Sequence, residues 1–303
     1  MKRLFSVIII CAVMLFSGCG RSENSENTVT PPFFKAVDKE TGGVVYMLGT
    51  MHVGAEGAVY PDEVYKALDE SDILAVELDV QELEANAAEL TEAMQIMMLK
   101  GCTAEEYIGE DYAEVRKWFV EKSLYNMVYD YYIPAVWSSM LSTKLAEDAG
   151  YKSELGTDRI LLTYAKEHNK EIYEIESAAE QYQINANEGR ELQVYMLVEA
   201  VRTDYDVQIQ QMNDLYSAWA SGDITALEDM LAADEPPEEL AEQYDRFCFE
   251  MYENRQKKMA EYVTDSLKNG DKAFVAVGAM HYAAAPDIID YVEQAGYTVN
   301  KIG

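Results

Sequence analysis

Two histidines of this chain stand in the same local setting, and an imidazole can bind a metal ion or carry a proton. His52 follows the stretch "VVYMLGTM", and His281 follows "AFVAVGAM". In each case an apolar, β-prone run leads into Gly-Xaa-Met-His, beginning at Gly49 and at Gly278. If the two runs are neighbouring parallel strands, both imidazoles emerge at the carboxyl edge of one sheet, where α/β proteins bind ligands. The pattern therefore predicts a shared site, although 229 residues separate the two histidines.

The two glycines predict a sharp turn as each strand leaves the sheet, and they predict space beside each histidine. The third histidine, His168, lies in "AKEHNKE" near the end of a predicted helix. An imidazole is favourable at the negative end of a helix dipole, so His168 is expected to be exposed and to stay outside the site.

Carboxylates end two further strand-like runs. Glu77 and Asp79 end "ILAVELD", and Glu174 and Glu176 end "IYEIES". At two-residue spacing in a strand, the members of each pair point to one face. An acid inside an apolar strand is costly unless it is paired or bound to a metal, so Glu77, with apolar residues on both sides, is the strongest candidate. The alternative is a surface acid at the end of a strand.

The elements that must position these residues alternate between strands and helices. "PPFFKAV" and "VVYMLGT" predict a hairpin, residues 61–72 predict a helix, and "ILAVELDV" and "KEIYEIES" predict two more strands. The chain closes with "AFVAVGAM", a helix in "PDIIDYVEQAG" and a strand in "YTVNKIG". These patterns predict an α/β fold with a mixed, mainly parallel central sheet assembled from both chain ends.

Large helical insertions are predicted between the strands, at about 81–150 and 178–269. The first insertion carries Pro134 within an aromatic-rich stretch that is expected to be helical. The second contains "YDRFCFEMYENRQ", where Tyr244, Phe247, Phe249, Met251 and Tyr252 cluster. The aromatic stripe around Pro134 is expected to pack in a core or to line a groove rather than to bind a cofactor.

The start of the chain predicts export. Lys2 and Arg3 precede a short apolar run that ends in "FSGC", so residues 1–18 are expected to be a signal peptide. "FSGC" resembles the lipobox of bacterial lipoproteins, which implies a lipid on Cys19 and attachment to the extracytoplasmic face of the cell membrane. An uncleaved anchor is the alternative. Residues 19–32 are expected to be a flexible tether, followed by one domain over 33–303.

Net charge, cysteine spacing and sequence motifs argue against several classes of protein. The chain has a net charge of −31, and removal of Lys2 and Arg3 with the signal peptide makes it −33, which disfavours nucleic-acid binding. Cys102 and Cys248 have no zinc-finger spacing and are expected to be buried singletons, with a disulfide as the alternative. The chain has no HExxH helix of a zincin and no GxSxG elbow.

Several stretches together resemble the TraB/GumN family, which is related to the Tiki metalloproteases. They are "YMLGTMHVG", "DILAVELD", "LGTDRILLTYAKEHNKEIYEIES", "NRQKKMAEYV" and "FVAVGAMHY". The resemblance covers roughly residues 33–303 and implies a metal-dependent peptidase that acts on a peptide or protein substrate. It implies that His52 and His281 are metal ligands and that Glu77 is a ligand or the general base.

The same resemblance marks Asp158, Glu176 and Arg255 as accompanying polar positions. Two imidazoles and one or two carboxylates could hold Mn, Co, Zn or Fe with positions open for water. Glu77 or Glu176 would then accept the proton of the water, and Arg255 could bind a substrate carboxylate or stabilise the developing oxyanion. The alternative is a non-catalytic lipoprotein that binds or sequesters a peptide, or haem as some distant relatives of this fold do.

Overall fold

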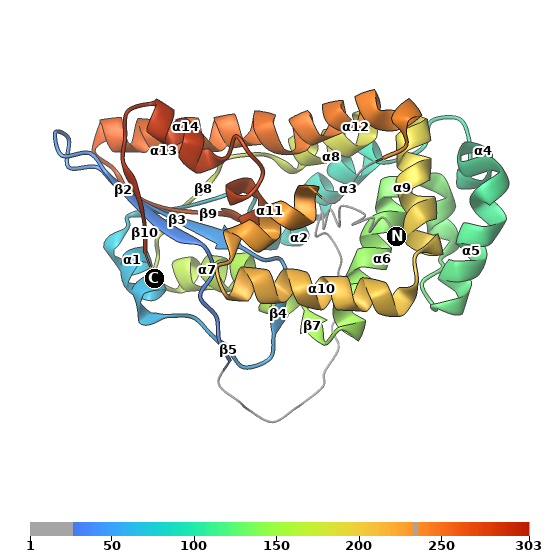
Figure 1. The fold of residues 1–303 in the computed structure, drawn as a ribbon, viewed down its shortest axis with the longest axis horizontal. Coiled ribbons are helices and arrows are strands. Elements are labelled where there is room, and N and C mark those ends of the chain that lie inside the picture. Colours follow the sequence, from blue (N-terminus) through green and yellow to red (C-terminus); the bar gives the residue numbers. More distant parts are fainter. Residues whose placement is uncertain (1–26, 233–235, 303) are drawn as a thin grey trace.

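The computed structural model describes residues 27–232 and 236–302, and six of its strands form the central sheet in the order β10-β2-β3-β9-β6-β8 (Figure 1). The predicted hairpin is formed by β2 (Phe33–Val37) and β3 (Val44–Thr50). Three strands continue the sheet in parallel with β3, namely β9 (Lys272–Gly278), β6 (Ile73–Val76) and β8 (Glu171–Glu174). The last strand, β10 (Val299–Lys301), pairs antiparallel with β2. The prediction of a mixed, mainly parallel sheet built from both chain ends is confirmed.

Helices cover both faces of this sheet. Residues of α13 (Asn254–Asn269) and α14 (Ile288–Gln294) pack in one cluster with Met47 and Val275. Residues of α1 (Asp62–Glu70) and α7 (Thr157–Glu167) pack in another with Leu48 and Phe274. Because side chains alternate along a strand, β3 and β9 are apolar on both faces, which explains their continuous apolar sequences.

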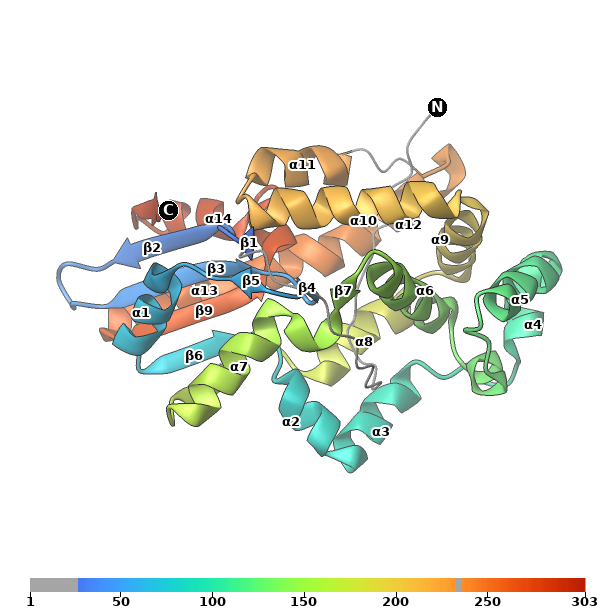
Figure 2. The same ribbon diagram turned by 90° about the horizontal axis from the view of Figure 1, so that it is seen from below.

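The two insertions are helical, as predicted. The first contains α2 (Val80–Ala85), α3 (Ala87–Ile96), α4 (Ala104–Ile108), α5 (Tyr112–Glu121) and α6 (Pro134–Asp148). The second contains α8 (Ala178–Asn187), α9 (Arg190–Arg202), α10 (Tyr205–Ala220), α11 (Ile224–Ala232) and α12 (Ala241–Cys248). Figure 2 shows these helices extending the molecule beyond the carboxyl ends of the parallel strands. Pro134 begins α6 instead of lying inside a helix, because a residue without an N–H is tolerated at the first helical position.

The first described residues differ from the predicted tether. Asn27–Thr28 form β1, which pairs with β5 (Ala58–Val59), and the side chain of Val29 is buried. The backbone N–H of Thr30 donates to the carbonyl of Ala220 at 2.7 Å. This segment therefore packs on the domain because it carries apolar residues among its polar ones, while the predicted signal peptide and Cys19 lie outside the described residues.

Two further features concern the described part of the chain. No helix within it is both long and apolar enough to span a membrane. Cys102 and Cys248 form no disulfide there, as expected, but both are half-buried instead of buried.

Candidate functional site

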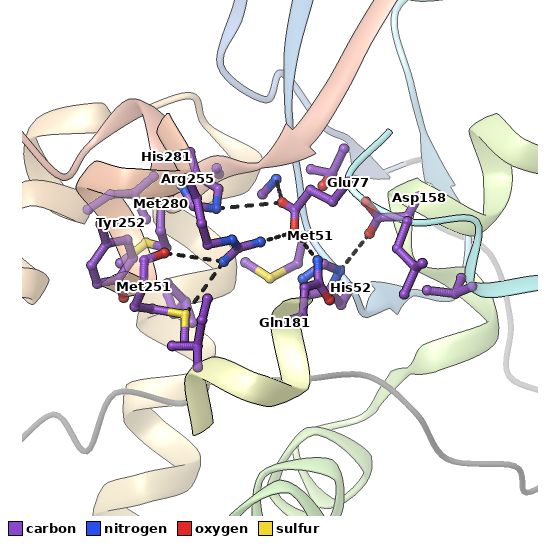
Figure 3. A pocket seen from close by; sticks show the side chains of 18 of the residues that line it. Met51, His52, Glu77, Asp158, Gln181, Met251, Tyr252, Arg255, Met280 and His281 are labelled. Atoms are coloured by element: carbon purple, nitrogen blue, oxygen red, sulfur yellow. Dashed lines mark hydrogen bonds and ion pairs between the residues drawn. The ribbon is translucent and has the colours of Figure 1, made fainter. Parts of the chain in front are cut away.

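The two predicted histidines meet because β3 and β9 are neighbours. Their parallel register runs from Val44 opposite Lys272 to Thr50 opposite Gly278, so the segments after both strands leave the same edge of the sheet. His52 and His281 line one cavity of about 150 Å³ together with Glu77, which follows β6. In Figure 3, His281 and Arg255 lie on one side of Glu77, and His52 and Asp158 lie on the other.

The glycines act through space and not through a turn. Gly278 has a φ of −50°, and Gly49 is not among the residues with positive φ, so neither needs the left-handed region. The turn that follows β9, a 3-10 helix over Ala279–Tyr282, therefore does not depend on the conformational freedom of glycine. A Cβ atom on Gly278 would lie 3.2 Å from Oε1 of Glu77, and one on Gly49 would lie 3.1 Å from Ala279. Space is therefore needed at both glycines. At Gly278 it lies beside His281 and is occupied by Glu77, whereas at Gly49 it is occupied by Ala279 and does not lie against His52.

His52 is oriented by Asp158, in the first turn of α7. The Nδ1 atom of His52 lies 2.8 Å from Oδ2 of Asp158, and the backbone N–H of Thr157 donates to the carbonyl of Met51 at 2.8 Å. Burial would lower the pKa of His52, but the Asp158 carboxylate, with a contribution from Glu77, raises it to about 9. His52 is therefore an imidazolium at neutral pH, with Nδ1–H donating to Asp158.

Glu77 and Glu176 share one guanidinium. Nη2 of Arg255 lies 2.7 Å from Oε2 of each glutamate, and its Nε donates to Oε1 of Glu176 at 2.8 Å. The other oxygen of Glu77, Oε1, accepts the backbone N–H of Gly278 at 2.6 Å. Burial would raise the pKa of Glu77, but Arg255 and the two histidines hold it well below its usual range, so Glu77 is a carboxylate.

His281 differs from His52 in its charge state. It is only 4% exposed, and its Nε2 lies 3.7 Å from Oε1 of Glu77, which is too long for a hydrogen bond. Its Nδ1 is buried and has no hydrogen-bond partner among the described residues. Burial and the charge of Arg255 lower the pKa of His281 to about 3, so this imidazole is neutral and can offer a lone pair.

The donors fit a divalent metal ion in part. An ion bound to two ligand atoms at about 2.1 Å holds them at most about 4.2 Å apart, which accommodates the 3.7 Å between His281 and Glu77. Asp158 binds Nδ1 of His52, the arrangement usual for metal-binding histidines, so a metal ion would bind at Nε2 and displace the proton that the imidazolium carries there. Within residues 27–232 and 236–302, however, no three His, Cys, Asp or Glu side chains are already grouped to hold an ion.

A known protein family matches nearly the whole of the chain. Residues 33–301 match the TraB/PrgY/gumN family. The chain belongs to this family. Neither the curated proteins nor the solved structures contain a significant match to it.

Two acids of this TraB/PrgY/gumN protein lie away from the cavity, so the expectation that each pair shares a face is wrong. Asp79 caps the start of α2 and pairs with Lys166 at 2.9 Å, and Glu174 accepts the backbone N–H of Asp79. The strands end at Val76 and Glu174, so the alternation of side chains does not continue to the second acid. The exposed His168 at the end of α7 is confirmed.

Three residues of the site have no counterpart among the predictions. Nε2 of Gln181 donates to Glu176 at 3.0 Å and to Glu77 at 3.3 Å. Met251 and Tyr252 lie in a π-helical turn, Phe249–Glu253, and the ring of Tyr252 meets that of His281 edge-on at 6.0 Å. The aromatic cluster in "YDRFCFEMYENRQ" could have indicated that Met251 and Tyr252 lie near the site. A glutamine in an ordinary helix gives no such indication. Such π turns often occur at functional sites.

Proposed function

We propose that this TraB/PrgY/gumN protein is a metal-dependent peptide hydrolase. The observation that carries the proposal is the convergence of His52, Glu77 and His281 on one cavity at the carboxyl edge of the sheet. An ion held by these residues would supply a bound water of lowered pKa and would polarise a substrate carbonyl. Mn, Co, Zn and Fe all suit a donor set of imidazole and carboxylate.

The protein's own residues have distinct parts in this proposal. Asp158 holds His52 through Nδ1, which leaves Nε2 as the ring nitrogen for a ligand in the cavity that His52 lines. Glu77 lines the cavity, so it is better placed to accept a proton than Glu176, which is only 6% exposed and does not line the cavity. Arg255 binds both carboxylates, and these contacts favour a role in orienting Glu77 over direct binding of an oxyanion.

The experiment compares metal content and peptide cleavage in the full chain purified in detergent. His52→Ala, His281→Ala and Glu77→Gln are expected to lose both bound metal and cleavage, and chelation of the wild type is expected to stop cleavage. Asp158→Asn is expected to lower either quantity about 10- to 100-fold. His168→Ala is the matched control because this histidine is exposed and lies outside the cavity. Unchanged cleavage in both site-histidine variants would falsify the proposal.

A second candidate is a non-catalytic lipoprotein that binds or sequesters a peptide or haem. It is favoured by the engagement of both oxygens of Glu77, one by Arg255 and the other by Gly278, and by the finding that no three metal-binding side chains are already grouped among the described residues. Binding that survives chelation, with no turnover on long incubation, would select it.

We also propose attachment through a lipid on Cys19 to the extracytoplasmic face of the cell membrane. Mass spectrometry of the amino-terminal peptide tests this directly. A diacylglyceryl mass on Cys19 is expected, and an unmodified thiol there would contradict the proposal.

A further inference from the structure

A second hollow, of about 670 Å³, lies beside the candidate site, and Tyr252 lines both. Its walls come from α11, α12, the π-helical turn and the segment Ala283–Ala285, which closely follows His281. We call it the side hollow. Since the rings of Tyr252 and His281 are in edge-on contact, the side hollow adjoins the His281 side of the candidate site.

The side hollow combines aromatic faces with carboxylates. Tyr244, Phe249 and Tyr252 supply the rings, and the ring-bearing side chain of Phe249 is 41% exposed. Three acids line it from separate elements: Glu228 of α11, Asp245 of α12 and Glu253 of the π-helical turn. Rings that contact an alkyl stem, with carboxylates that contact its charged head, suit a lysine or arginine side chain.

An ammonium group of the protein itself, that of Lys257, already contacts two residues that line the side hollow. Its Nζ lies 2.6 Å from Oε1 of Glu253 and 5.2 Å from the centre of the Phe249 ring. Lys257 thereby neutralises one of the three acids. Glu228 and Asp245 have no ion-pair partner among the residues that the structure describes, so two carboxylates remain for an incoming cation.

A buried acceptor points to a ligand as well. Gln256 is 0% exposed and lines the side hollow, and its Nε2 donates to the carbonyls of His281 at 3.2 Å and Ala284 at 2.9 Å. Its Oε1 is buried without a hydrogen-bond partner in the described part of the chain. A buried acceptor left unsatisfied is costly, and an N–H group of a bound peptide would satisfy it.

We propose that the side hollow is a subsite for a lysine or arginine side chain, so that the protein selects basic peptides. The proposal rests on the proposed function for the bond that is cleaved, but occupancy of the subsite can be measured without cleavage. The net charge of −31 would also favour encounters with basic peptides over acidic ones.

The experiment uses two labelled peptides that differ only in one residue, lysine or norleucine, and the full chain in detergent. Binding is followed by fluorescence anisotropy and cleavage by mass spectrometry. The lysine peptide is expected to bind about fivefold more tightly, the size typical of one partly exposed charge pair. The double variant Glu228→Gln, Asp245→Asn should lose this preference. Glu242→Gln, which removes an exposed acid of α12 outside the hollow, should keep it.

Equal binding of both peptides by the wild type, or a preference that persists in the double variant, would overturn the subsite. Cys248 lines the side hollow and Cys102 does not, so bound lysine peptide should slow alkylation of Cys248 alone. An unchanged alkylation rate at Cys248 would count against the subsite. A binding preference without cleavage would keep the subsite and overturn the hydrolase, whereas cleavage without preference would do the reverse.

Discussion

The Nδ1 atom of His52 lies 2.8 Å from a carboxylate oxygen of Asp158, a residue 106 positions further along the chain. This contact sets the two site histidines apart. His52 holds its proton to a pH of about 9, whereas the buried His281 remains neutral down to about pH 3. One cavity therefore contains an imidazolium and a neutral imidazole at the same pH.

Because the charge on His52 stabilises the fold, the free energy of unfolding should fall at alkaline pH. Its pKa of about 9 in the folded protein exceeds the 6.5 of an unperturbed histidine, so its stabilising contribution is complete below pH 6.5 and is lost as pH rises through 9. In Asp158→Asn, burial lowers this pKa and the alkaline loss should disappear. Urea unfolding at pH 6.5 and pH 9 with chelator measures this. An equal alkaline loss in the variant would contradict the assignment.

Asp287 should have the opposite effect in the acid range. Burial raises its pKa to about 6, so ionisation destabilises the fold as pH rises from about 4 to above 6. Asp287→Asn keeps the side-chain oxygen that caps α14 and removes the buried charge. It is expected to stabilise the protein by about 1 kcal/mol at pH 7, after allowance for solvent screening, and to give no gain below pH 4. Urea unfolding at both pH values checks the sign.

Arg255 should be needed for stability as well as for the site. Arg255→Met leaves the carboxylates of Glu77 and Glu176 buried without their cation, which should cost about 3–5 kcal/mol. Addition of Glu176→Gln removes one of the two charges and should recover part of that loss. A double-mutant cycle measured by chemical unfolding tests this, and strictly additive effects would show that the ion pairs are not coupled.

Gly156 should be required where α7 passes His52. A Cβ atom at this position would lie 2.4 Å from the carbonyl oxygen of His52, so Gly156→Ala must displace backbone, at a cost of about 1–3 kcal/mol. The pKa of His52, followed by NMR, should fall as its contact with Asp158 loosens. Gly43→Ala is the matched control because its Cβ would lie 2.4 Å from the carbonyl of Leu267, far from the cavity. It should lower stability and leave this pKa unchanged.

The central sheet and the meeting of the two histidines could be predicted because both depend on local patterns. Continuous apolar runs indicate strands buried on both faces, and a repeated Gly-Xaa-Met-His places His52 and His281 at corresponding strand ends. Parallel pairing of those strands then brings the imidazoles together. Glu77 was predictable for a similar reason, since an acid within an apolar run needs a partner.

Other features depended on where elements end and on packing between distant segments. Two-residue spacing suggested that Asp79 shares a face with Glu77, but β6 ends at Val76 and the backbone changes direction before Asp79. Gln181 contacts both glutamates only because α8 packs there, and nothing in its local sequence marks it. His52 and His281 stand in matching motifs but differ in charge state. This difference likewise arises from their tertiary neighbours and not from the motifs.

The pairing of β3 with β9 joins residues as far apart as Val44 and Lys272. During translation, a ribosome must therefore complete most of the polypeptide before the second half of the site exists. Nascent chains that stop short of β9 carry His52, Glu77 and Asp158 but lack the neighbour that brings them opposite His281. The order of strands thus ties the cavity to the synthesis of β9, since a product that stops before this strand lacks His281.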